Sequence, residues 1–134
     1  MMGVNMRNYS DCKVLVVDDM STMRKIVTNL LVDVGFAKEK IADADDGITA
    51  QHYLENNEVD FIVTDWNMPK VTGIELLRWV RSHERHKNVP VLMVTAEAKK
   101  EQIVEAAQAG VNGYIVKPFN SKTLSQKIAK IFEG

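Results

Sequence analysis

Short apolar runs alternate along this chain with segments in which apolar residues recur every three or four positions. The mostly apolar runs are Val14–Val17, Phe61–Asp65, Val91–Thr95 and Tyr114–Val116, with a weaker one near Lys40–Ala44. Continuous apolar runs of this length are typical of strands that are covered on both faces. The five runs therefore predict the strands of a buried parallel sheet.

Helical periodicity fills the stretches between the runs. The first helix carries apolar residues from Met23 to Val34; Ser21 is predicted to cap it and Gly35 to end it. Further helices are predicted at about 47–56, from Ile74 through Val80, from Glu97 to Ala109, and after a cap at Ser121, with 69–73 as a loop. Five strands alternating with five helices predict a doubly wound α/β fold, with right-handed crossovers and helices on both faces.

Length and composition limit the classes of function. With 134 residues the chain is predicted to form one domain, 12–134, after a flexible N-terminal arm, 1–11. A net charge of −1 gives no field for nucleic acid, and no apolar run approaches the roughly 20 residues that membrane insertion needs. A single cysteine, Cys12, suits a reducing compartment. A cytoplasmic monomer is the expectation.

Polar residues follow four of the predicted strands. Asp18 and Asp19 come after the first, Asp65 ends the third, Thr95 ends the fourth and Lys117 follows the fifth. Because the carboxyl ends of parallel strands meet at one edge of a sheet, we expect these side chains to share one rim. Any single acid there could merely cap the following helix, but the joint placement favours a functional site.

Three crowded carboxylates repel one another, and a hard divalent cation such as Mg²⁺ relieves the repulsion. A lysine on the same rim can meet a phosphoryl group, and a threonine hydroxyl can donate a hydrogen bond to it. An aspartate nucleophile with a metal and a lysine is a sufficient set for phosphoryl transfer, which needs positioning and charge neutralisation. The rim therefore predicts a magnesium-dependent aspartyl-phosphate site.

Other functions fit the residues less well. An aspartyl-phosphate hydrolase needs an acid two positions after its nucleophile, and after Asp65 that position is Asn67. Nucleotide binding has no support, because neither glycine-rich phosphate motif occurs. The histidines, His52, His83 and His86, do not share a metal-ligand spacing, and we expect the last two on a solvated face. Lys117-Pro118 after a strand indicates a fixed turn, in which a cis bond is one option.

Four segments together, VLVVDD, TDWNMP, VTAEAKKE and GYIVKPF, resemble the receiver domain of two-component response regulators. Within that family the resemblance is to the single-domain chemotaxis regulators, and it extends from about Cys12 to Phe132. It implies a flavodoxin-like receiver fold with strand order 2-1-3-4-5.

The resemblance also implies a role for each rim residue. Asp65 would accept the phosphoryl group carried on a kinase histidine. Asp19, Asp65 and the backbone carbonyl of Asn67 would ligate Mg²⁺, while Asp18 would hold a metal-bound water or orient the other ligands. Lys117 would pair with the phosphoryl oxygens.

Two residues would act in switching. Thr95 would move its hydroxyl toward the phosphoryl group, and Tyr114 would rotate into the space that Thr95 vacates. Asn67 and Glu97 would tune the lifetime of the acyl phosphate. No enzyme activity is implied beyond self-catalysed phosphotransfer and dephosphorylation.

The partners implied are a histidine kinase of the chemotaxis type and the flagellar motor switch protein, with a dedicated phosphatase as an optional addition. The docking face would comprise Lys99, Lys100, Ile103, Ala107, Tyr114, Phe119, Lys127 and Lys130. Met20, Asn120 and Lys122 depart from the pattern of the chemotaxis regulators. The alternative is therefore a relative that serves as a phosphate sink or as the messenger of another pathway.

Overall fold

The structure is a computed structural model and describes residues 9–133. Its centre is a five-stranded parallel sheet, in the spatial order β2-β1-β3-β4-β5. The strands are β1 (Val14–Val17), β2 (Ile41–Ala44), β3 (Phe61–Asp65), β4 (Val91–Thr95) and β5 (Gly113–Val116). Both the doubly wound fold and the strand order 2-1-3-4-5 are confirmed.

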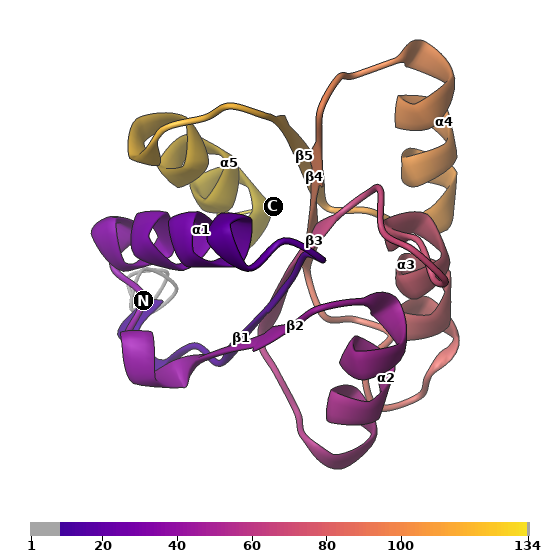
Figure 1. Ribbon diagram of the computed structural model, residues 1–134, viewed down its shortest axis with the longest axis horizontal. Coiled ribbons are helices and arrows are strands. Elements are labelled where there is room, and N and C mark those ends of the chain that lie inside the picture. Colours follow the sequence, from indigo (N-terminus) through magenta and orange to yellow (C-terminus); the bar gives the residue numbers. More distant parts are fainter. Residues whose placement is uncertain (1–8, 134) are drawn as a thin grey trace.

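Five α-helices cover the sheet in two layers. They are α1 (Ser21–Val34), α2 (Gly47–Asn56), α3 (Gly73–Ser82), α4 (Lys100–Ala109) and α5 (Ser121–Glu133). Figure 1 shows α1 and α5 together on one face, with α2, α3 and α4 on the other. Two short 3₁₀ helices, η2 (Tyr9–Asp11) and η3 (Lys38–Lys40), precede β1 and β2. Among the described residues, no helix combines the length and the apolar character needed to cross a membrane.

The two layers explain why β1 is apolar without interruption. In β1, Leu15 and Val17 pack into the core under α2 to α4, whereas Val14 and Val16 pack into the core under α1 and α5. All four are almost completely buried. A strand buried on both faces has no position for a solvated side chain, so its charged residues stand at its ends. This is what concentrates the polar chemistry at the rim of the sheet.

The predicted helix starts need correction. Ser21 is the first residue of α1, not its cap; the capping position is Met20, which makes no side-chain cap hydrogen bond. At α5 the cap is Asn120 rather than Ser121, because the Asn120 Oδ1 atom accepts from the Thr123 amide at 2.9 Å. The helix expected from Glu97 begins at Lys100. The predicted end of α1 at Gly35 is confirmed, with φ of 130°.

The predicted arm, 1–11, divides into two parts. Residues 1–8 lie outside the described residues. Residues 9–11 form η2, and Tyr9 is buried, stacked on Phe36 with ring centroids 4.8 Å apart and tilted against Phe132 at 5.8 Å. Burial of this aromatic ring packs residues 9–11 against the rest of the described chain.

Candidate functional site

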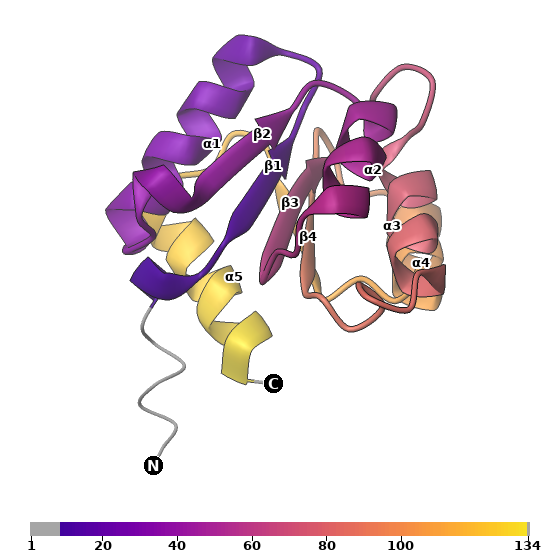
Figure 2. The same cartoon turned by 90° about the horizontal axis from the view of Figure 1, so that it is seen from below.

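The loops after β1 and β3 lie next to each other at one edge of the sheet, since β1 pairs with β3 (Figure 2). They bring Asp18 and Asp19 together with Asp65, and one carboxylate oxygen from each lies within 4.8 Å of the other two. Asp18 and Asp65 are buried, whereas Asp19 is exposed. The predicted meeting of acids from two remote segments is thus present in the structure.

Lys117 reaches this acidic cluster from the end of β5. Its Nζ atom lies 3.1 Å from Asp65 Oδ1 and 3.8 Å from Asp18 Oδ2. The Lys117 amide donates to the Thr95 carbonyl at 2.8 Å, which fixes the turn beside β4, and the Lys117-Pro118 bond is cis. Lys117 thus stands in salt-bridge range of two of the three carboxylates, and the cluster keeps a negative charge.

Burial makes this charge costly. It is the main cause that raises the pKa values of both Asp65 and Asp18 above the ordinary carboxyl value; repulsion between the acids adds to it, and Lys117 opposes it. The donors are hard carboxylate oxygens at mutual distances that one ion can span. This donor set fits Mg²⁺, which prefers oxygen ligands and uses one or two carboxylates together with water or phosphate oxygens.

The loop after β3 is built tightly against the Asp65 backbone. The Trp66 amide donates to Val94 at 2.9 Å and the Gly73 amide to Trp66 at 2.8 Å. A Cβ atom on Gly73 would overlap the Asp65 carbonyl oxygen, so this position needs glycine. Thr72 and Glu75 then form a capping box that starts α3. Asp65 is therefore held between a strand and a well-capped helix start.

Thr95 and Tyr114 lie beside the cluster, on β4 and β5. The Thr95 hydroxyl donates to the Glu97 carbonyl at 2.8 Å, so in this structure it is engaged by the β4–α4 loop. Thr95 and Tyr114 line a small hollow of about 10 Å³, together with Trp66 and residues of α4. The Lys127 ammonium stands 5.1 Å from the centre of the Tyr114 ring, in cation–π range.

The other predicted site residues lie at the surface. Asn67 is exposed after Asp65, and Glu97 is exposed and paired with Lys99 at 3.1 Å. All eight residues of the predicted docking face are at least partly exposed, on or next to α4, β5 and α5: Lys99, Lys100, Ile103, Ala107, Tyr114, Phe119, Lys127 and Lys130.

The prediction for His86 was wrong. Instead of lying on a solvated face, His86 is only 1% exposed, and its Nε2 atom lies 2.7 Å from the Leu54 carbonyl of α2. The Trp79 and His83 rings pack next to it, with centroids 6.3 and 5.0 Å away. The turn after α3 folds back over α2, and a polar pattern in sequence does not show this.

Sequence reasoning also missed Arg24. Its guanidinium bonds the Asp18 carbonyl at 2.7 Å and the Asp43 carboxylate at 2.8 Å, so it touches the backbone of the acidic loop. A basic residue in the first turn of the helix after Asp-Asp was the available signal.

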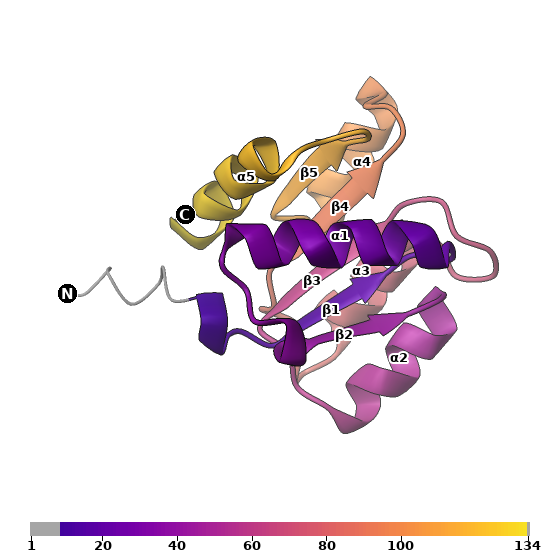
Figure 3. The ribbon, with the colours of Figure 1, turned by 60° about the vertical axis from the view of Figure 1, so that its left-hand side comes forward.

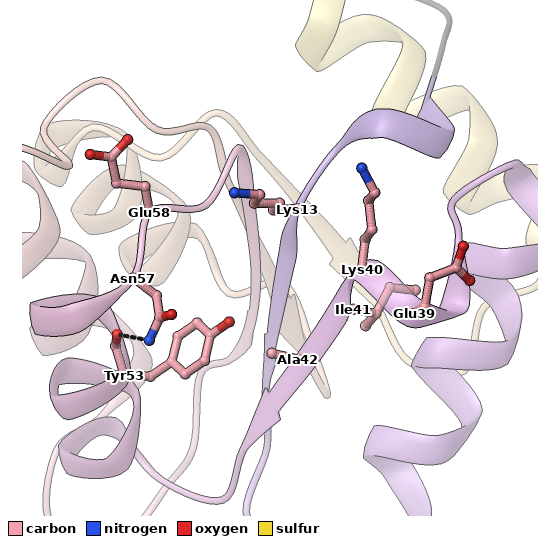
Figure 4. Close-up of a pocket in the computed structure, with 8 residues that line it drawn as sticks. All are labelled: Lys13, Glu39, Lys40, Ile41, Ala42, Tyr53, Asn57 and Glu58. Atoms are coloured by element: carbon pink, nitrogen blue, oxygen red, sulfur yellow. Dashed lines mark hydrogen bonds between the residues drawn. The ribbon is translucent and has the colours of Figure 1, made fainter.

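A separate hollow of about 290 Å³ lies at the amino ends of β1 and β2, away from the acidic cluster. Figure 4 shows the Tyr53 ring of α2 pointing toward Ala42 of β2, with Asn57 just after the end of α2. Its rim carries two lysines, Lys13 and Lys40, and two glutamates. The balanced charge gives it no preference for an anion, and we assign it no part in the chemistry of the rim.

The family follows from comparison with known proteins. Residues 14–129 match the response regulator receiver domain, and the chain therefore belongs to that family. It is 64% identical over 121 residues to the chemotaxis protein CheY of Pseudomonas aeruginosa, covering 90% of this chain and 96% of that protein. It is 61% identical to CheY-3 of Vibrio cholerae, over 90% of this chain and 92% of that protein.

Solved structures agree with this assignment. CheY4 of Vibrio cholerae superposes with a TM-score of 0.81 at 36% identity, covering 90% of this chain and 98% of that one. The receiver domain of the Pseudomonas aeruginosa sensor kinase PA1611, at 26% identity and a TM-score of 0.80, covers 92% and 98%. That domain was solved with a magnesium ion coordinated in its active-site cleft.

Proposed function

We propose that this chain is a phosphorylation-activated switch of the chemotaxis type, in which Asp65 is the phosphoacceptor. The observation that carries the proposal is the position of the Asp65 carboxylate, buried, 3.1 Å from Lys117 and within 4.8 Å of two further acids. The relatives that are 61–64% identical are chemotaxis proteins, which supports the pathway. The proposal places the protein in the cytoplasm, with a histidine kinase as donor.

In the proposed reaction a carboxylate oxygen of Asp65 attacks the phosphorus carried on a kinase histidine. The P–O bond forms as the P–N bond breaks, and the departing imidazole takes up a proton. Magnesium, when bound by Asp18, Asp19, Asp65 and the Asn67 carbonyl, would neutralise charge on the phosphoryl oxygens. Lys117 supplies a fixed positive charge on the same side of Asp65.

The product is expected to persist, unlike an enzymatic intermediate. A hydrolase would need an acid two residues after Asp65, and the side chain there is the exposed amide of Asn67. The chain is therefore proposed to act as a phosphoacceptor and not as an enzyme with turnover on free phosphate esters.

The test is incorporation of acid-labile phosphate from a small phosphodonor in the presence of Mg²⁺. Wild type should be labelled and Asp65→Asn should not, with circular dichroism confirming that both are folded. Asp60→Asn, which removes an exposed acid at the other end of β3, is the matched control and should be labelled like wild type. Labelling that survives Asp65→Asn would point to another acceptor.

The proposed output is docking of a partner on the face formed by α4, β5 and α5. This face mixes lysines with partly exposed apolar side chains, which suits an acidic, partly apolar peptide of the flagellar motor switch. Phosphorylation adds about −1.5 to −2 charge, which can favour a different arrangement of the Thr95 loop. Phosphorylated protein should therefore be retained on the switch peptide more strongly than unmodified protein.

Equal retention of the two forms would favour the alternative, a phosphate sink or a messenger of another pathway. Two departures from the chemotaxis pattern motivate it. Met20 is 62% exposed beside the acidic cluster, and Asn120 is used as the cap of α5.

A further inference from the structure

Arg24 connects the acidic loop to the edge strand of the sheet. Its Nη1 atom donates to the Asp18 carbonyl oxygen at 2.7 Å, and its Nε atom donates to the Asp43 carboxylate at 2.8 Å. The side chain of Arg24 is 18% exposed and that of Asp43 is 57% exposed. One guanidinium in the first turn of α1 therefore joins the β1–α1 loop to β2.

The Asp18 carbonyl, which accepts from Arg24, adjoins the proposed metal ligand Asp19. The Asp18 oxygen belongs to the planar peptide that links Asp18 to Asp19. Holding this oxygen fixes the orientation of that plane, and so fixes the direction in which the chain leaves toward Asp19. The Asp18 side chain is held separately, since its Oδ1 atom accepts from the Met20 amide at 2.9 Å.

Arg24 differs from Lys117 in what it touches. Lys117 contacts the Asp18 and Asp65 carboxylates themselves, where it competes with a metal ion for the same oxygens. The two Arg24 bonds go to a backbone oxygen and to Asp43, which leaves the cluster carboxylates available. Arg24 can therefore stay in place when a cation binds.

The Arg24–Asp43 pair also borders two surface hollows. Hollows of about 500 and 250 Å³ lie on its two sides, and both residues line both of them. Replacing Arg24 by a side chain of similar length thus opens no cavity in the core. A loss of metal affinity on replacement can be separated from a loss of folding.

We propose that Arg24 is a positioning residue for magnesium binding: it orients Asp19 through the Asp18 carbonyl, and Asp43 holds Arg24 in place. This inference rests on the proposed magnesium site. Residues that hold metal ligands through hydrogen bonds typically change affinity by about 10- to 100-fold when they are lost. Because the backbone is also held by β1, we expect the lower end of that range.

The experiment is a Mg²⁺ titration followed by Trp66 fluorescence and by calorimetry. Arg24→Met should weaken Mg²⁺ binding about tenfold, Arg24→Lys should recover part of this loss, and Asp43→Asn should weaken binding less than Arg24→Met. Lys25→Met is the matched control: it removes the same charge from the next, exposed residue, and should leave affinity within about twofold. Urea unfolding of each metal-free variant measures stability separately.

The outcomes separate this inference from the proposed function. If wild type fails to bind Mg²⁺, the proposed function and this inference fall together. If wild type binds and Arg24→Met binds within twofold of it, only the role of Arg24 is refuted. Equal losses in Arg24→Met and Lys25→Met would also refute it, since net charge alone would then explain the effect. A loss confined to Arg24→Met, with partial recovery in Arg24→Lys, supports it.

Discussion

Removing one buried acid from the rim should stabilise the metal-free protein. The change is Asp18→Asn, which keeps an Oδ1 atom able to accept from the Met20 amide. In the wild type, Asp18 is buried and shares the cluster with two other carboxylates no more than 4.8 Å away. Asparagine removes both repulsions and the cost of burying the charge, but it also loses the attraction to Lys117 at 3.8 Å.

Coulomb's law gives the size of the attraction and of the repulsions. At an effective dielectric constant of about 20, the attraction at 3.8 Å amounts to about 4 kcal/mol, and each repulsion at 4.8 Å to about 3.5 kcal/mol. Because Asp19 is exposed, solvent screens its repulsion of Asp18 below this value. The repulsions and the attraction are of similar size, so the cost of burying the Asp18 charge, which is the first cause of its raised pKa, decides the sign. We expect Asp18→Asn to be more stable by about 1–3 kcal/mol at neutral pH and low salt.

The pH dependence follows from the raised pKa of Asp18, whose main cause is burial. A carboxyl with a raised pKa in the folded state binds its proton more tightly than in the unfolded state. The loss of folding stability caused by the ionised Asp18 is therefore absent below the ordinary carboxyl pKa. It grows as pH rises from that value to the raised pKa, and it is complete above the raised pKa. The advantage of Asp18→Asn should accordingly vanish in acid.

The assay is urea unfolding followed by circular dichroism, in EDTA and in excess Mg²⁺. Asp33→Asn, a change at an exposed acid of α1, is the control for net charge. Mg²⁺ at ten times its dissociation constant should add about 1.4 kcal/mol to wild type and much less to Asp18→Asn. Lower stability of Asp18→Asn in EDTA, or equal stabilisation of both proteins by Mg²⁺, would refute the reasoning.

Three further predictions concern the same edge of the sheet. Lys117→Ala should weaken phosphate-dependent partner binding more than Mg²⁺ affinity, because the lysine competes with the metal for Asp65; calorimetry showing a collapse of Mg²⁺ affinity would contradict this division of roles. Thr72→Ala should cost about 1 kcal/mol in urea unfolding, since it breaks the capping box of α3, and an unchanged midpoint would show that the cap contributes nothing. Lys70→Gly should stabilise by about 0.5–1 kcal/mol, because Lys70 has a φ of 68°, in the left-handed region; a less stable variant by thermal unfolding would show that Lys70 makes a compensating contact.

The rim could be predicted from sequence because a strand that is buried on both faces has no position for a charged side chain except at its ends. Asp18, Asp65 and Thr95 stand at or just after the ends of the buried strands β1, β3 and β4, and Lys117 follows the less buried edge strand β5. Parallel pairing then brings those ends to one edge of the sheet. Alternation of strands and helices was enough to derive this without knowledge of any side-chain contact.

What could not be predicted depends on backbone detail or on contacts across the fold. Ser21 and Asn120–Ser121 are all capping residue types, and only the backbone decides that Asn120 accepts a hydrogen bond and Ser21 is already helical. The charged neighbours of His86 indicated solvent, but the turn places its ring against α2. Figure 3 shows α1 and β2 side by side, the arrangement that lets Arg24 reach Asp43.

The structure also suggests where a charge on Asp65 would act most easily. The Thr95 hydroxyl holds the start of the β4–α4 loop through Glu97, with a bond of 2.8 Å to a neutral carbonyl. A phosphoryl oxygen would offer the same hydroxyl a charge-assisted bond, roughly twice as strong as a neutral one. The helix that follows has Lys99 at its capping position and no side-chain cap hydrogen bond. In the proposed switch, the Thr95 hydroxyl would therefore exchange the Glu97 carbonyl for a phosphoryl oxygen. Because no side chain caps the start of α4, α4 would be the element that moves.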